Sequence, residues 1–426
     1  SLGGQNDGEL LHGHGYTYSS AQPGMVVKKM VEAGSSRCIF YFDELDKVAS
    51  KGSSNEIYGI LLHLTDPSLN SAFQDRFFQE VTFPLSNAIF IFSYNEATEI
   101  DPILLDRITE IPVCPFSTSA KVEIAQKFLV SELAQESGFE KGVCEFKKED
   151  LEYLVDAYTF EAGVRELKRL LGKFYMDLNV QRIYQRGCFK GGKELTSASP
   201  LKVSRELLLK QLESPRAALK EVHSSDLLGV INGLYANSVG RGGIVPIEIT
   251  QNFTTGRRWC LKYSGHQGDI MKESVLAGYS AAVSCVRDDL WEKYFWNPKF
   301  YGFHINAPSA AVPKDGPSAG SAFAIGFLSL IFNKKVRRKV AITGEVELTG
   351  KIAKAGGLRY KLGGAKRAGV TLVLVPEENK KEVEKLLVEN PALQDENFKI
   401  EFASNIRNVL GRVLLDFDET EVKPPS

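Results

Sequence analysis

The clearest candidate for catalysis is a serine in a turn rich in glycine and proline. The segment PKDGPSAG at 313–320 is followed directly by small and apolar residues that favour a helix, so Ser318 is predicted at or near a helix N-terminus. Backbone N–H groups at such an end can hold an oxyanion. A serine becomes a nucleophile only when a base removes its proton. The turn therefore predicts acyl-transfer chemistry if a base lies within reach.

Lys361 is the strongest candidate for that base. The sequence has no G-x-S-x-G motif and only six histidines, whereas the segment GGLRYK at 356–361 opens a second predicted helix. A lysine can act as a base when burial lowers its pKa toward neutrality, and the small and apolar residues around Lys361 favour this. Spacing alone leaves the ordinary alternatives open, namely Ser318 as a helix N-cap and Lys361 as a solvated lysine.

A second group of polar residues is typical of nucleotide hydrolysis. The apolar strand predicted at 38–42 ends in Asp43 and Glu44, and a second apolar strand at 87–92 precedes Asn95. In an open α/β sheet, ligands bind beyond the carboxyl ends of the strands. There, one carboxylate can hold Mg²⁺ and another can orient the attacking water. The alternative is an ordinary strand followed by a polar turn.

Two arginines extend this second group. Arg107 follows in the segment LLDR at 104–107, and Arg165 stands where another helix is predicted to begin. An arginine directed at a γ-phosphate stabilises transition-state charge, although a single arginine more often forms a surface ion pair. The sequence contains no G-x-x-x-x-G-K-[ST] motif. The phosphates of a nucleotide would therefore lack a backbone cradle and its lysine.

The elements that must position these residues form an α/β chain of several blocks. Residues 1–114 alternate apolar strands with a helix at 57–64, which predicts a parallel sheet covered on both faces. Residues 115–222 read as an all-α block and a linker, with helices at 119–136, 148–157, 162–184 and 204–213.

The last large block mixes strands and helices. Within 223–415 we predict strands at 247–249, 259–263, 340–342 and 371–375, and helices at 269–289, 318–332, 358–368 and 379–389. Residues 416–426 form an acidic tail with two prolines that we expect to be frayed.

Composition excludes several classes of protein. A chain of 426 residues with 43% hydrophobic and 25% charged residues is globular, with two to four domains. The net charge of −1 gives no global field for nucleic acid, and the longest apolar run, 322–332, is too short to cross a membrane. The six cysteines form no CxxC pair, so we expect reduced thiols rather than disulfides or a zinc site.

Taken in order, the motifs resemble those of the Lon family of ATP-dependent serine proteases, over nearly the whole chain. The most specific are PKDGPSAG (313–320), TGE (343–345), GGLRYK (356–361) and AKRAGV (365–370). The resemblance implies that Ser318 is the nucleophile and Lys361 the general base. It also implies that Thr343 orients the lysine and that His304 and Asp315 lie near this pair.

The resemblance also assigns the domains. Residues 1–114 would be the C-terminal part of an AAA+ large subdomain, 115–222 its helical lid subdomain and linker, and 223–415 an α+β proteolytic domain. The family's N-terminal domain and its Walker A P-loop have no counterpart in the sequence, which suggests a fragment. The remaining implied roles are Asp43 and Glu44 as Walker B acids with Asp43 on Mg²⁺, Asn95 as sensor 1, Arg107 as arginine finger, Arg165 as sensor 2 and Tyr18 in the substrate pore.

The expected function is therefore an ATP-dependent endopeptidase that threads unfolded or damaged proteins into the chamber of a homohexamer. The intact protein would use ATP/ADP and Mg²⁺, but peptide cleavage itself would need no metal, and the ATPase would be impaired in this chain. The expected compartment is the cytoplasm, or the mitochondrial matrix in a eukaryote. Neither DNA nor a membrane is indicated as a partner.

Two alternatives remain open. Family members often have a second histidine where this chain has Asn306, and a glycine where it has Ala310. These departures leave room for a chaperone-like unfoldase with an inactive protease domain. The other alternative keeps the enzyme but uses Ser318 with His304 and Asp315, which predicts a rate that rises near pH 6–7, where a histidine titrates.

Overall fold

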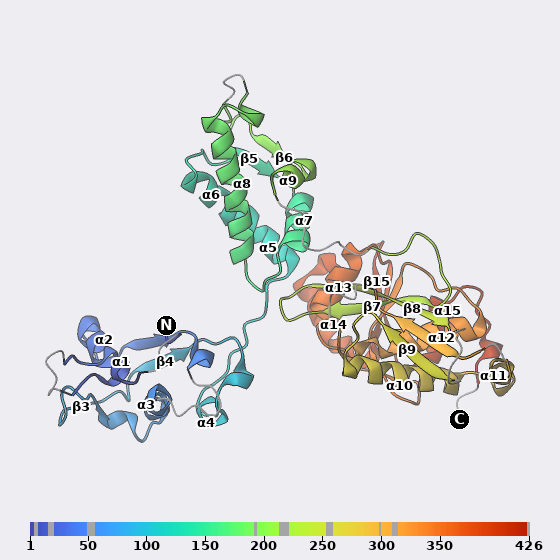
Figure 1. The fold of residues 1–426 in the computed structure, drawn as a ribbon, viewed down its shortest axis with the longest axis horizontal. Helices are drawn as coiled ribbons and strands as arrows, with labels where there is room; N and C mark the ends of the chain where they lie inside the picture. The colour runs from blue at the N-terminus through green and yellow to red at the C-terminus, as the bar shows by residue number, and fades with distance from the viewer. Residues whose placement is uncertain are drawn as a thin grey trace. The chain divides into compact units, whose positions relative to one another are not determined.

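The chain divides into two compact units, Ser1–Val113 and Cys114–Ser426, which are described separately (Figure 1). A computed structural model describes residues 1–3, 7–15, 21–48, 56–190, 194–212, 221–252, 259–297, 300–308 and 314–423. Tyr18 and Ala310 lie outside the described residues. Among the described residues, no helix is both long and apolar enough to cross a membrane.

The first unit is built around two parallel strands, β1 (Ile39–Phe42) and β4 (Ile89–Phe92), with α3 (Glu56–Thr65) between them in sequence. Both strands and the helix were predicted. Phe42 stacks on Phe92 in the core, with ring centroids 5.4 Å apart. The other elements of this unit are α1 (Glu9–His12), α2 (Met25–Ala33), β2 (Phe73–Gln74), β3 (Thr82–Phe83) and α4 (Pro102–Leu105).

The prediction that both faces of this sheet are covered is wrong for the described residues. Ile39, Tyr41 and Ile89 are 63%, 61% and 57% exposed, while Phe40 and Phe42 are buried. Successive residues of a strand point to opposite faces, and the described helices pack against only one of them. An apolar run shows that both faces are suited to burial. It does not show that a covering layer is present.

The second unit begins with a helical block. Helices α5 (Thr118–Ile124) and α6 (Val130–Glu136) are continuous through a π-helical turn at Ala125–Leu129. Ser117 and Ser204 cap α5 and α9, because each side chain accepts a hydrogen bond from a first-turn amide. The remaining helices are α7 (Lys148–Tyr158), α8 (Arg165–Ile183) and α9 (Arg205–Gln211).

This block was predicted as all-α, and that prediction is wrong in one respect. Two short strands, β5 (Cys144–Phe146) and β6 (Leu201–Val203), pair in parallel. Three residues are too few for an alternating pattern to stand out from the neighbouring helices. The four helical segments were predicted correctly, except that α8 begins at Arg165, three residues later than expected.

The rest of the second unit is a seven-stranded mixed sheet with the order β15-β14-β11-β7-β8-β10-β9. Strand β8 pairs antiparallel with β7 and β10, and the other neighbours are parallel. The strands of the sheet are β7 (Val230–Ala236), β8 (Gly242–Gln251), β9 (Cys260–Ser264), β10 (Gly302–Asn306), β11 (Val340–Ile342), β14 (Leu372–Pro376) and β15 (Lys399–Ala403). A separate hairpin joins β12 (Glu345–Val346) to β13 (Ile352–Ala353).

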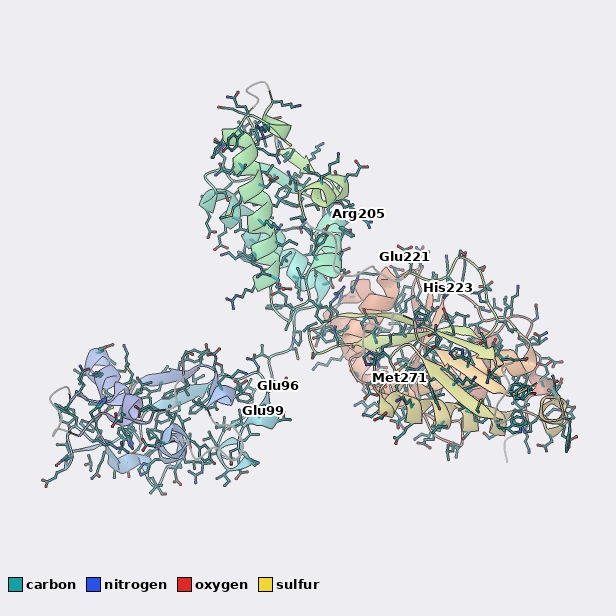
Figure 2. The ribbon with its side chains drawn as sticks, in the orientation of Figure 1. Glu96, Glu99, Arg205, Glu221, His223 and Met271 are labelled. Atoms are coloured by element: carbon teal, nitrogen blue, oxygen red, sulfur yellow. The ribbon has the colours of Figure 1, made fainter. Side chains whose placement is uncertain are left out.

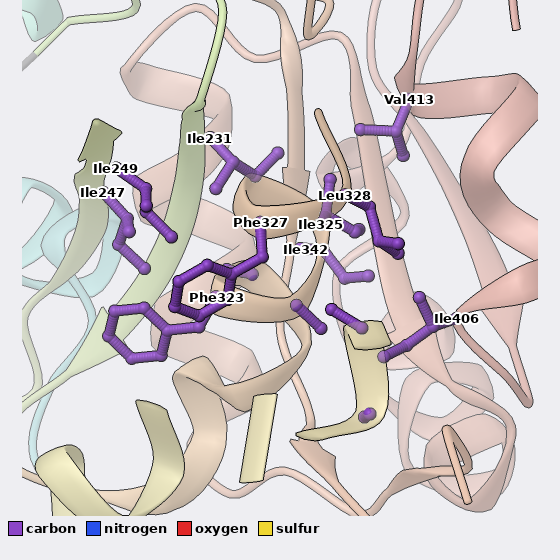
Figure 3. Packing of buried hydrophobic residues seen from close by; sticks show 14 of the residues in the cluster. Ile231, Ile247, Ile249, Phe323, Ile325, Phe327, Leu328, Ile342, Ile406 and Val413 are labelled. Atoms are coloured by element: carbon purple, nitrogen blue, oxygen red, sulfur yellow. The ribbon is translucent and has the colours of Figure 1, made fainter. Parts of the chain in front are cut away.

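Helices cover the two faces of this sheet. Helices α10 (Asp269–Cys285) and α12 (Gly320–Phe332) share one core, in which Phe323 and Phe327 pack near Ile231 (Figure 3). Leu358 and Leu362 of α13 (Leu358–Arg367) share a second core on the other face with α14 (Lys380–Glu389). The helix that follows the candidate serine and the helix that carries the candidate lysine thus lie on opposite faces of one sheet.

Two boundaries differ from the prediction. The helix predicted at 269–289 is two helices, α10 and α11 (Asp288–Phe295), because Val286 leaves the helix and bridges to Val422. The acidic tail is not frayed as far as residue 423, since the amide of Lys423 donates to the carbonyl of Cys285 at 2.9 Å. The prediction weighed the acidic residues and the prolines of this tail, whereas its Phe417 and Val422 pack against the core. A last short helix, α15 (Leu410–Val413), precedes this tail.

Candidate active site

Ser318, Lys361 and Thr343 meet at the carboxyl end of β11. The Nζ of Lys361 donates to the Oγ of Ser318 at 2.9 Å and to the Oγ1 of Thr343 at 3.1 Å. Thr343 directly follows β11, Ser318 lies in a 3₁₀ turn before α12, and Lys361 lies in the first turn of α13. These are ordinary hydrogen-bond distances. The structure therefore brings together three of the five predicted catalytic residues.

The environment of Lys361 favours its neutral form. The residue is only 4% exposed, and burial lowers the pKa of its amine to about 8, against a weaker opposing effect of the Glu382 carboxylate. Desolvation disfavours a charged amine, which explains the direction of the shift. Near pH 8, about half of the amines would be neutral and able to accept a proton.

The serine is held by its backbone. The amide of Gly344 donates to the carbonyl of Ser318 at 2.8 Å, and the Oγ of Ser274 donates to the carbonyl of Pro317 at 3.0 Å. Gly316 has a φ of +122°, a conformation that glycine adopts without strain. Sequence reasoning missed Ser274, because a small polar residue in a helix gives no signal of a distant backbone partner.

Asp315 and His304 have other partners. Asp315 accepts hydrogen bonds from the amide of Met271, a residue labelled in Figure 2, at 2.8 Å and from that of Gly316 at 3.0 Å. It therefore ties the serine turn to the start of α10. The Nε2 of His304 lies 3.0 Å from the Oγ of Ser264. The hydrogen bonds of the described residues join neither side chain to Ser318. The arrangement does not support a triad of Ser318, His304 and Asp315.

Asn306 belongs to the same surface network as His304. The Oγ of Ser264 donates to its Oδ1 at 2.8 Å, and its Nδ2 donates to Glu248 at 2.7 Å. Asn306, which departs from the family pattern, therefore belongs to a separate network. No hydrogen bond between described residues connects that network to Ser318 or Lys361.

In the first unit, the predicted nucleotide residues follow the ends of β1 and β4. The Oγ of Ser93 donates a hydrogen bond to Asp43, and this contact lowers the pKa of the Asp43 carboxyl. Glu44 accepts from Ser1 at 3.0 Å, and Asn95 is exposed. Carboxylate and amide oxygens are ligands that Mg²⁺ prefers. The side chains at this sheet edge are therefore of the types that suit the metal part of a nucleotide site, while the described residues contain no phosphate cradle and no group of three His, Cys, Asp or Glu side chains that could hold a metal.

The two predicted arginines differ in their contacts. Arg107 donates to the carbonyl of Leu62 at 2.7 Å and forms an ion pair with Asp66 at 3.3 Å within its own unit. Arg165 is exposed at the start of α8, in the second unit. Their roles as arginine finger and sensor 2 remain predictions.

Comparison with protein families places three sequence profiles along the chain. The Lon protease (S16) C-terminal proteolytic domain matches residues 202–416, and the Lon protease AAA+ ATPase lid domain matches 135–178. The profile of the ATPase family associated with various cellular activities (AAA) matches 9–115. The first of these matches covers half of the chain.

Individual relatives agree with these profiles. A Lon protease homolog of Acanthamoeba polyphaga mimivirus is 39% identical over 98% of this chain and 46% of its own length. The Lon protease of Desulforamulus reducens is 33% identical over 100% of this chain and 50% of its own. Lon protease 1 of Syntrophotalea carbinolica is 34% identical over 96% and 47%. The chain thus spans about half the length of these relatives.

Proposed function

The chain belongs to the Lon protease family, and from that premise we propose that it cleaves peptide bonds with Ser318 as nucleophile and Lys361 as general base. One observation carries the proposal: the buried amine of Lys361 lies 2.9 Å from the hydroxyl of Ser318. A neutral amine at this distance can take the hydroxyl proton as the oxygen attacks.

The proposed reaction has two steps. In the first, the Oγ of Ser318 attacks the scissile carbonyl while Lys361 takes its proton, and backbone N–H groups at the start of α12 hold the oxyanion. Lys361 then gives the proton to the leaving amine. In the second, Lys361 activates a water that hydrolyses the acyl-enzyme. Thr343 keeps the amine directed at the serine through its 3.1 Å hydrogen bond.

The remaining assignments rest on the family. We assign 1–114 to an AAA+ large subdomain, 115–222 to its lid and linker, and 223–415 to the proteolytic domain. With a nucleotide bound, Asp43 would hold Mg²⁺, with Glu44 and Asn95 beside it, and ATP would supply the energy for moving the substrate. Unfolded proteins as substrates and a homohexamer as the assembly are part of the same proposal.

The proposal predicts cleavage of a small unstructured fluorogenic peptide without ATP, and no cleavage after Ser318→Ala. The substitution removes only the hydroxyl at a partly buried position, so circular dichroism should be unchanged. Cleavage that persists in the variant would show another nucleophile or a contaminating peptidase. If neither protein cleaves, the chaperone-like alternative with an inactive protease domain gains support.

The rate of cleavage should rise with pH through about 8 and level off above it. Lys361 acts as a base only when neutral, and burial lowers its pKa to about 8, so the active fraction grows as pH increases past that value. The measurement is kcat/KM for the peptide from pH 6 to 10. A rise that is already complete near pH 7 would instead indicate a histidine base.

A further inference from the structure

Helix α13, which carries Lys361, is tied to the helical block at both of its ends. At the start of α13, the hydroxyl of Tyr360 donates to the carbonyl of Pro115 at 2.9 Å. At its last residue, the Nε of Arg367 lies 2.8 Å from the Oδ2 of Asp156 on α7. The residue next to the candidate base and the end of its helix are therefore both fixed by residues that precede the protease sheet.

Asp156 is the centre of these contacts. Its side chain is only 3% exposed, and besides Arg367 it accepts a hydrogen bond from Thr118 at 3.0 Å. The guanidinium of Arg241 donates to the backbone carbonyl of Asp156 and, at 3.4 Å, to that of Thr159. A carboxylate buried to this degree is costly unless it is paired, so its geometry is strongly constrained.

Arg241 extends the constraint to the first turn of α13. It directly precedes Gly242, whose backbone presses on the helix so closely that an added Cβ would lie 2.0 Å from the carbonyl oxygen of Tyr360 and 2.8 Å from the amide of Lys361. The backbones of Gly242 and of the first turn of α13 are in direct contact, with no flexible side chain between them. A displacement of the backbone at Arg241 and Gly242 would therefore move the first turn of α13.

We propose that Asp156 is a positioning residue, which acts through Arg367 and Arg241 to hold α13 where the amine of Lys361 meets Ser318. This inference rests on the proposed serine–lysine mechanism and adds a determinant of its activity that lies outside the protease sheet. It implies that displacement of α7 weakens the catalytic pair although α7 contributes no catalytic group.

Arg367→Gln tests the proposal. Arg367 is 30% exposed at the side chain, so the variant removes the ion pair with a limited loss of packing. We expect kcat for the fluorogenic peptide to fall about tenfold with KM unchanged, because a small displacement of a reacting group is costly. The rising limb of the pH–rate profile should also shift to higher pH, since a less tightly held amine is better hydrated and regains a higher pKa. Arg367→Lys, which keeps the charge, should recover part of kcat.

The matched control is Arg359→Gln, which breaks an ion pair between the same helix and the exposed Glu389 of α14. This variant should leave kcat and the rising limb of the pH–rate profile unchanged. Equal effects of the two variants would overturn the proposal. So would a rise in KM without a fall in kcat. A lower melting temperature of Arg367→Gln, with no shift in the rising limb of its pH–rate profile, would also overturn it. If both residues act through the same contact, the double variant Asp156→Asn/Arg367→Gln should have a kcat no lower than that of the slower of the two single variants.

The Ser318→Ala control separates this inference from the function on which it rests. If cleavage depends on Ser318 but is the same in Arg367→Gln and Arg359→Gln, the serine–lysine mechanism stands and the positioning role of Asp156 is wrong. If cleavage does not depend on Ser318, the proposed function itself fails.

Discussion

Replacing Lys361 by methionine is expected to lower kcat for the fluorogenic peptide by about three orders of magnitude. Methionine fills most of the buried space but cannot accept a proton, and the Oγ of Ser318 loses its partner at 2.9 Å. The fold should survive, because the variant removes a buried amine that is desolvated and replaces it with an apolar group. Steady-state kinetics at pH 8 to 9 give the result.

Two further variants make this expectation specific. Lys361→Arg keeps a positive charge but cannot be deprotonated, so it should be as inactive as the methionine variant. Lys351→Met removes an exposed lysine whose ion pairs with Glu347 and Glu378 lie at the surface, and it should retain normal kcat. Substantial activity in Lys361→Arg would show that the residue supplies charge rather than acting as the base.

Gly364→Ala is expected to lower the free energy of unfolding by about 3 kcal/mol, because the added methyl overpacks a close contact. Its Cβ would lie 2.1 Å from the carbonyl carbon of Gly242 and 2.3 Å from the amide nitrogen of Gly243, so strand β8 and helix α13 must separate. Lys361 lies one turn earlier in the same helix, and peptide cleavage should fall as well. Chemical denaturation and the peptide assay measure the two effects.

The adjacent Gly363 supplies the control. A Cβ there would meet only the flexible end of Arg367, at 3.5 Å. Alanine is the better helix former, so Gly363→Ala should be neutral or stabilise the protein by up to about 1 kcal/mol. Similar destabilisation by both substitutions would mean that the close contact with β8 does not set the cost at Gly364, because a Cβ at Gly363 would make no such contact.

Much of the fold was predictable, because its long elements have strong local patterns. The helix after Ser318 and the helix around Lys361 were found at nearly their observed bounds. Strands β5 and β6 were missed because a pairing of three residues across more than fifty intervening positions leaves no periodic signal. The break at Val286 was missed because the apolar pattern continues through it, while Val286 bridges to Val422 near the end of the chain.

The candidate site was predictable from motif order, but its supports were not. Ser318 and Lys361 were named from the residue types around them and from the family resemblance. Asp156 was not, because a single acid in an otherwise ordinary amphipathic helix gives no sign that it is buried. Its partner Arg367 lies in the AKRAGV segment that helped to identify the family, yet the pattern gives no direction for the side chain.

The order of strands has a consequence for how such a protein is made. Ser318 leaves the ribosome 43 residues before Lys361, and β11, which precedes Thr343, lies in the sheet between β7 and β14. Translation at about 5–20 residues per second leaves an interval of a few seconds in which Ser318 has been made but Lys361 has not. If the two residues act as proposed, a growing chain would carry the serine without its base for this interval, and strands β14 and β15 of the sheet would still have to be made after Lys361.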